Sequence, residues 1–192
     1  SGPVNAISLI RKSGIKVVSI SEAWKLEDIA RKVSEVSAAL GRSDLGNSLN
    51  AKLSSAVGSA RLNKKVKVAF LYLRGTNAIY LIGGKGSGAD SLISAIGGVD
   101  VGASMLKNPF NTLTPEALVK ANPNVLLLMT KGLASVGGES GLLKLPGVAQ
   151  TNAGKYGRIV TVDDSLLLSF GPRSYSLVRS EEHTSELQSH LN

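Results

Sequence analysis

The 192-residue sequence contains no cysteine. Its absence excludes disulfide bonds, thiolate metal sites and thiol catalysis, and it is compatible with a cytosolic or an exported protein. Long apolar runs are also absent: the longest, at residues 125–129, has the length of a strand, whereas a membrane-spanning helix needs about 20 apolar residues. The chain opens at Ser1 without a basic-then-apolar segment, and we expect its signal segment to be missing from this sequence.

Aromatic residues make up only 4% of the chain, and this bears on how its net charge of +8 is interpreted. Lys and Arg are scattered and cluster only at residues 64–67. With so few rings to stack on bases, we expect no nucleic-acid partner. A solvated basic surface is the simpler explanation of the charge, and a small anionic ligand is compatible with it.

Histidine occurs only as His183 and His190, within residues 179–192. This stretch has no apolar period of 3.6 or 2 residues, and it resembles the translation of a sequencing-adapter oligonucleotide. We therefore leave it out of the fold argument and expect it to make almost no buried contacts. Neither His is then a candidate metal ligand or acid–base catalyst.

The remaining sequence alternates between helical and strand patterns. Apolar residues recur at intervals of three and four in residues 26–40 and 45–62, which predicts two helices. Further helices are expected at residues 4–11, 87–96, from 114, at 138–145 and after 171. Strands are expected at residues 15–20, 66–73, 78–82, 125–130 and 158–162. This order predicts an α/β fold with a mostly parallel sheet flanked by helices.

A glycine-rich loop at residues 83–89 follows a predicted strand and opens a helix. It fits the loose form of a dinucleotide-binding fingerprint, in which a helix amino terminus holds an anion. That fingerprint also needs an acid on the next strand about 20 residues later, and Asp100 comes too soon. A flexible loop that lines a cleft and caps the helix is the better explanation.

Tyr72 and Arg74 lie at the carboxyl end of the strand predicted at residues 66–73. Residues two apart on a strand face the same way, so both side chains should project together beside the glycine-rich loop. A phenolate oxygen is a hard ligand that suits ferric iron, and a neighbouring cation favours the ionised form. A half-buried Tyr beside a solvated Arg explains the same spacing and is favoured when the spacing is considered alone.

Two other residues are candidates for contact with a ligand. Met129 ends the apolar strand at residues 125–130, where ligand sites of open α/β sheets form, although core packing explains a Met equally well. Phe110 either stacks on a flat ligand or covers its loop. The sequence contains no catalytic constellation, and we expect a binding protein rather than an enzyme.

These segments together resemble the hemin-binding lipoproteins of bacterial haem ABC importers, which are two-lobed substrate-binding proteins with a long connecting helix. The resemblance covers residues 1–178. It is carried by the motifs at residues 72–75, 86–93, 97–100, 113–118, 145–151, 163–164 and 170–173.

The resemblance implies that Tyr72 is an axial ligand of haem iron and that Arg74 hydrogen-bonds its phenolate. Met129, Phe110 and the loop residues Gly86 and Ser87 would contact the haem. Glu116 matches a carboxylate that docks on the membrane permease. The family's second axial ligand, a His, belongs to the amino-terminal lobe.

The same resemblance implies how the chain is divided. Residues 1–20 would be a remnant of the amino-terminal lobe, residues 21–62 the connecting helices, and residues 63–178 the carboxy-terminal lobe. We expect a monomer that works outside the cytoplasm, in the periplasm or lipid-anchored at the membrane. A siderophore- or cobalamin-binding protein of this fold is an alternative, and a nucleotide-binding enzyme domain that uses residues 83–89 is a weaker one.

Overall fold

The computed structural model describes residues 4–58, 64–74 and 81–175. The predicted tail at residues 179–192 lies outside the described residues, and so does the first part of the strand predicted at 78–82. The elements are α1 (Val4–Lys12), α2 (Leu26–Ala39), α3 (Ser43–Gly58), β1 (Lys67–Tyr72), β2 (Leu81–Gly83), α4 (Ala89–Ala95), β3 (Val99–Asp100), α5 (Val101–Met105), β4 (Phe110–Thr112), α6 (Pro115–Ala121), β5 (Val125–Met129), α7 (Thr130–Ser135), α8 (Gly138–Leu142), α9 (Asn152–Lys155), β6 (Ile159–Val162), α10 (Asp164–Ser169) and the 3₁₀ helix η1 (Pro172–Ser174).

The strands form one mixed sheet in the order β4-β2-β1-β5-β6, with β3 also paired to β1. β1 runs parallel to β3 and β5, and β5 runs parallel to β6. β2 is antiparallel to both of its neighbours. Only eight residues separate β1 from β2 in the sequence, fewer than the dozen or so that a parallel crossover needs. The predicted α/β fold with a mostly parallel sheet is confirmed.

Alternate residues of the central strands bury opposite faces of the sheet. Val68 and Phe70 of β1 belong to a cluster, called here the first face, which is covered by residues of α2, α4 and α10. Ala69 and Leu71 belong to the second face, which is covered by residues of α6 and α8. Full burial of a Leu or Phe side chain contributes about 1.5–3 kcal/mol to stability, so this two-sided burial accounts for the nearly unbroken apolar sequences of β1 and β5.

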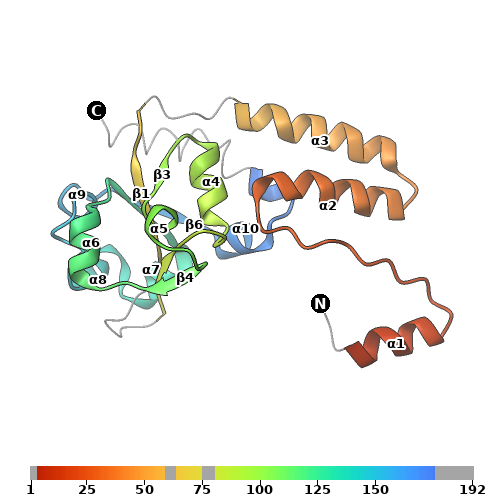
Figure 1. Ribbon diagram of the computed structural model, residues 1–192, viewed down its shortest axis with the longest axis horizontal. Coiled ribbons are helices and arrows are strands. Elements are labelled where there is room, and N and C mark those ends of the chain that lie inside the picture. Colours follow the sequence, from red (N-terminus) through yellow and green to blue (C-terminus); the bar gives the residue numbers. More distant parts are fainter. Residues whose placement is uncertain (1–3, 59–63, 75–80, 176–192) are drawn as a thin grey trace.

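Helices α2 and α3 lie side by side to one side of the α/β body (Figure 1), where the sequence predicts two helices. The helices approach closely at Gly46, where an added Cβ would come within 2.0 Å of the Ser37 Oγ. The side-chain amide of Asn50 donates to the backbone oxygen of Ala30 and to the Ser34 Oγ, both at 3.0 Å. α2 buries Leu26, Ile29 and Val33 toward the first face.

The prediction of a strand at residues 15–20 is wrong. The segment between α1 and α2 forms no strand, and its Ile15 and Val18 are 61% and 46% exposed. The run has β-branched residues, but a strand also needs a hydrogen-bonded neighbour, and no strand of the described residues pairs with it. Figure 1 shows α1, at the start of this segment, standing apart from the body.

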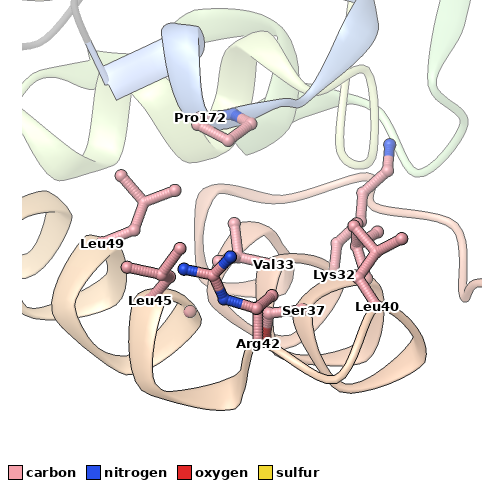
Figure 2. Close-up of a pocket in the computed structure, with 10 residues that line it drawn as sticks. Lys32, Val33, Ser37, Leu40, Arg42, Leu45, Leu49 and Pro172 are labelled. Atoms are coloured by element: carbon pink, nitrogen blue, oxygen red, sulfur yellow. The ribbon is translucent and has the colours of Figure 1, made fainter.

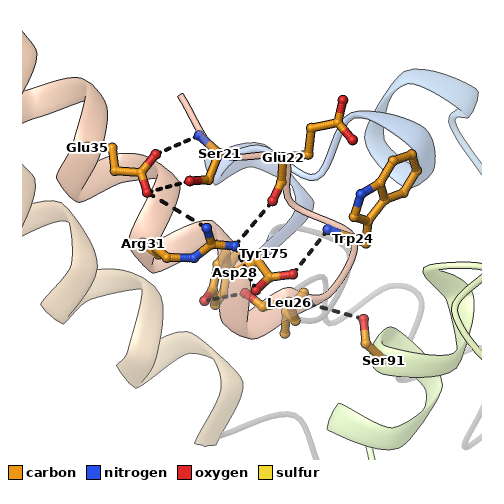
Figure 3. Close-up of polar contacts among 9 residues, drawn as sticks. All are labelled: Ser21, Glu22, Trp24, Leu26, Asp28, Arg31, Glu35, Ser91 and Tyr175. Carbon is orange, nitrogen blue, oxygen red and sulfur yellow. Dashed lines mark hydrogen bonds and ion pairs between the residues drawn. The ribbon is translucent and has the colours of Figure 1, made fainter. Parts of the chain in front are cut away.

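The end of this segment is attached to α2 by polar contacts (Figure 3). The backbone N–H and the hydroxyl of Ser21 donate to the two carboxylate oxygens of Glu35, at 2.6 and 2.8 Å. Arg31 donates to the backbone oxygen of Glu22 at 3.2 Å and forms an ion pair with Asp28 at 3.1 Å. The entry to α2 therefore has a defined path although it lies outside the sheet.

Candidate ligand-binding site

Tyr72 is the last residue of β1, and its hydroxyl is joined to Arg74. The Nε and one terminal nitrogen of Arg74 donate to the Tyr72 hydroxyl oxygen at 2.8 and 2.5 Å. The guanidinium carbon lies 5.1 Å from the centroid of the Tyr72 ring. Tyr72 is half-buried and packs against the first face, whereas Arg74 is exposed. The structure therefore brings together the pair that the strand period predicts.

Phe110 extends this site with a second aromatic ring. Its ring centroid lies 5.4 Å from that of Tyr72 and 6.3 Å from that of Phe70. Phe110 pairs with Gly83 across the β2–β4 ladder, and a Cβ added at Gly83 would come within 2.4 Å of the Phe70 ring. Glycine at that position therefore leaves room for the aromatic side chains around it. Phe110 is 39% exposed, so the aromatic patch formed by Phe70, Tyr72 and Phe110 presents a ring to solvent.

Met129 lies at the carboxyl end of β5 in the first-face cluster, against which Tyr72 also packs. The side chain is only 4% exposed. Core packing accounts for this position in the structure, and contact with a ligand stays a prediction.

The glycine-rich loop is held by Asp90, a residue that the sequence argument missed. One carboxylate oxygen of Asp90 accepts from the backbone N–H of Gly86 at 2.8 Å, and the other accepts from that of Gly88 at 3.0 Å. Gly86 and Gly88 both have a positive φ, which favours glycine. An Asp in the first turn of the helix that follows such a loop is the signal that would have identified this clamp. Ser87, between the two glycines, has a buried Oγ without a hydrogen-bond partner among the described residues.

Glu116 lies where the sequence predicts it, exposed in the first turn of α6. Thr114 caps this helix, because its Oγ1 accepts from the backbone N–H of Ala117 at 3.2 Å. The predicted helix start is confirmed, and the docking role of Glu116 stays a prediction.

An open apolar pocket of about 370 Å³ lies elsewhere, between α2, α3 and Pro172 (Figure 2). It is lined by Val33, Val36, Leu45 and Leu49 among others. None of the predicted site residues lines it.

Within residues 4–58, 64–74 and 81–175, no helix combines the length and apolar character that a membrane crossing requires. No group of three or more His, Cys, Asp or Glu residues there is arranged to hold a metal ion.

Comparisons with known proteins agree with this architecture. The profile described as periplasmic binding protein matches residues 3–166. Among curated proteins no match was found. The periplasmic heme-binding protein RhuT from Roseiflexus sp. RS-1, in its apo form, is 34% identical with a TM-score of 0.87, over 100% of this chain and 74% of RhuT.

Two other solved structures are similar at the same level. BhuT, a periplasmic heme-binding protein solved with two hemes, is 31% identical with a TM-score of 0.85, over 100% of this chain and 73% of its own. The heme-binding protein HmuT is 32% identical with a TM-score of 0.79, over 97% of this chain and 62% of its own. Solved variants of HmuT replace a His, a Tyr and an Arg by Ala one at a time, and this Tyr and Arg are two positions apart. The chain belongs to the periplasmic binding protein family.

Proposed function

We propose that the chain captures ferric haem outside the cytoplasm and delivers it to an ABC-type permease. The observation that carries this proposal is its identity of 31–34% to three heme-binding proteins over 97–100% of its length. The proposed role is binding and transfer, with haem as the transported cargo and no chemical conversion.

Tyr72 is the proposed axial ligand of the haem iron. A phenolate oxygen carries three lone pairs, and two of them accept the hydrogen bonds from Arg74. The third is then available to ferric iron, a hard cation that suits an anionic oxygen. The Arg74 guanidinium holds this oxygen in place through both hydrogen bonds. Phe110 would pack against the porphyrin ring, Met129 would contact its edge, and Gly86 and Ser87 would line the cleft.

The proposed division of the chain follows the resemblance to two-lobed binding proteins. Residues 63–178 would form one wall of the binding cleft, residues 21–62 the connection, and residues 1–20 the last part of the other lobe. The other lobe would supply the second axial ligand, a His. The chain would act as a monomer, either free in the periplasm or lipid-anchored at the membrane.

Titration with ferric haem tests the ligand assignment. The chain should give the Soret and charge-transfer bands of tyrosinate-ligated ferric haem, and Tyr72→Phe should abolish them because it keeps the ring but removes the oxygen. Tyr156→Phe is a matched control, since Tyr156 also has an Arg two residues later, with the Arg158 guanidinium carbon 4.8 Å from its ring centroid. Coinciding spectra of wild type and Tyr72→Phe would remove Tyr72 as the ligand.

Arg74→Ala separates the charge from the ligand. The tyrosinate bands should persist, but ferric haem should bind more weakly, because the phenolate oxygen loses the two hydrogen bonds from Arg74. A haem affinity equal to that of the wild type would show that Arg74 has no part in ligation.

The same titration distinguishes the alternatives. A saturable response to a ferric siderophore or to cobalamin, with none to haem, would reassign the ligand within the same fold. A saturable response to NAD or ATP would favour the nucleotide-binding alternative.

Delivery to the permease is proposed to involve Glu116. Its place in the first turn of α6 is already favourable through the helix dipole, by about 0.3–1 kcal/mol. In an intact transport system, Glu116→Ala should leave the haem spectrum unchanged and reduce haem uptake. Haem uptake at the wild-type rate would show that Glu116 acts only by stabilising the amino terminus of α6.

A further inference from the structure

Lys85 and Lys107 lie on two neighbouring loops beside the aromatic residues of the site. The backbone N–H of Lys85 donates to the backbone oxygen of Leu106 at 3.5 Å, so the turn after β2 runs beside the loop before β4. Both loops adjoin Phe110, because Gly83 at the end of β2 is paired with it. Two lysines therefore lie on the loops that adjoin Phe110, whose ring packs against Tyr72.

Both lysines are exposed, and no ion pair within the described parts of the chain involves either of them. The acid closest to Lys85 in sequence is Asp90, whose two carboxylate oxygens are bound by the backbone N–H groups of Gly86 and Gly88. The two ammonium groups are therefore available to an anionic ligand.

A third lysine, Lys131, follows Met129 at the end of β5 but has an acid beside it. Hydrogen bonds from Ser165 are the main cause that lowers the pKa of Asp163, and the charge of Lys131 lowers it further. The backbone N–H of Lys131 also donates to the Asp164 carboxylate at 3.1 Å. Lys131 therefore differs from Lys85 and Lys107 in having carboxylates beside it.

We propose that Lys85 and Lys107 bind the carboxylates at the edge of a planar apolar ligand whose ring lies against Phe110. The inference rests on the proposed function, since the two propionates of haem are such carboxylates. A flat ring gains affinity from burial against an aromatic side chain. This apolar contact does not determine how the ring is rotated in its own plane. Cations on one side of the patch would fix that rotation and would favour porphyrins that carry acidic side chains.

The test compares ferric haem with its dimethyl ester, in which both carboxylates are capped. Each exposed ion pair is worth about 0.2–1 kcal/mol, so Lys85→Ala/Lys107→Ala should lose about 2- to 30-fold in affinity for haem. Its affinity for the ester should equal that of the wild type, and added salt should narrow the gap for haem. Lys131→Ala is the matched control and should bind haem as the wild type does.

Three results would overturn the inference while the proposed function stands. These are equal haem affinity in the wild type and the double variant, an equal loss for haem and ester, or a loss in Lys131→Ala as large as in the double variant. A wild-type chain that gives no saturable spectrum with haem or ester would instead refute the proposed function itself. Lys85→Gln/Lys107→Gln repeats the measurement with longer polar side chains and guards against a folding defect.

Discussion

Gly88 is the position where one added methyl group should disturb the site's loop most strongly. It is the cap residue before α4, with φ of 88° and ψ of −42°, a conformation that L side chains rarely adopt. A Cβ there would come within 2.4 Å of one carbon of the Phe170 ring and 2.6 Å of another. Phe170 is only 3% exposed and lies in the first-face cluster, so its ring has little room to move.

The loss of stability in Gly88→Ala has two parts. An unfavourable backbone conformation costs about 1–3 kcal/mol, and inserting a carbon into a packed core costs about 1–3 kcal/mol more. We therefore expect a decrease of about 2–6 kcal/mol in the free energy of unfolding, against a usual total of about 5–15 kcal/mol. Urea unfolding followed by circular dichroism measures it.

Gly137→Ala is the matched control, because Gly137 has φ of 90° but its added Cβ would find its nearest neighbour at 3.9 Å. It should lose only the backbone part, about 1–2 kcal/mol. Gly88→Ala/Phe170→Leu should recover some of the packing part, which appears as a favourable coupling in a double-mutant cycle. Equal losses in Gly88→Ala and Gly137→Ala, with no coupling to Phe170, would refute the packing argument.

Two further predictions concern carboxylates. Burial raises the pKa of Asp100, so its ionisation opposes folding and the free energy of unfolding should fall as the pH rises from about 3.8. Asp100→Asn keeps an acceptor for the backbone N–H of Ala103 and should be at least as stable as the wild type at pH 7, whereas Asp100→Ala should lose about 1 kcal/mol through the missing cap; urea unfolding that ranks Asp100→Asn below Asp100→Ala would contradict this. The backbone N–H of Ser21 is the main cause that lowers the pKa of Glu35, followed by the Ser21 hydroxyl. That contact should protect the Ser21 amide from hydrogen exchange at neutral pH and lose this effect as the pH falls below 4.5, and Glu35→Gln should make the protection independent of pH in this range.

The sequence predicts the parts of the fold whose signal is local. α2, α6 and β5 have an apolar period or run long enough to identify them, and Thr114 and Pro115 mark the start of α6. β3 and β4 have only two and three residues, so their pairing partners, far away in the sequence, decide that they are strands. Residues 15–20 have the composition of a strand without such a partner. The composition of a segment therefore does not decide whether it forms a strand when its pairing partner lies far away in the sequence.

The site divides in the same way. Tyr72 and Arg74 are two residues apart in one segment, so the strand period alone is enough to predict that they meet. The contact of Phe110 with Tyr72 depends on the register that pairs Gly83 with Phe110, and no local pattern contains that register. The sequence therefore leaves two roles open for Phe110, stacking on a flat ligand or covering its loop.

The glycine-rich loop shows how a local pattern can suggest the wrong chemistry. A phosphate that binds such a loop uses its free backbone N–H groups, but those of Gly86 and Gly88 already donate to the Asp90 carboxylate. Hydrogen bonds to charged groups contribute about 1.5–3 kcal/mol each, so a phosphate would have to displace two of them and then lie beside the negative charge it displaced. The same two hydrogen bonds restrain the loop beside Gly83, which is paired with Phe110. They favour a structural role for the loop over the binding of a phosphate.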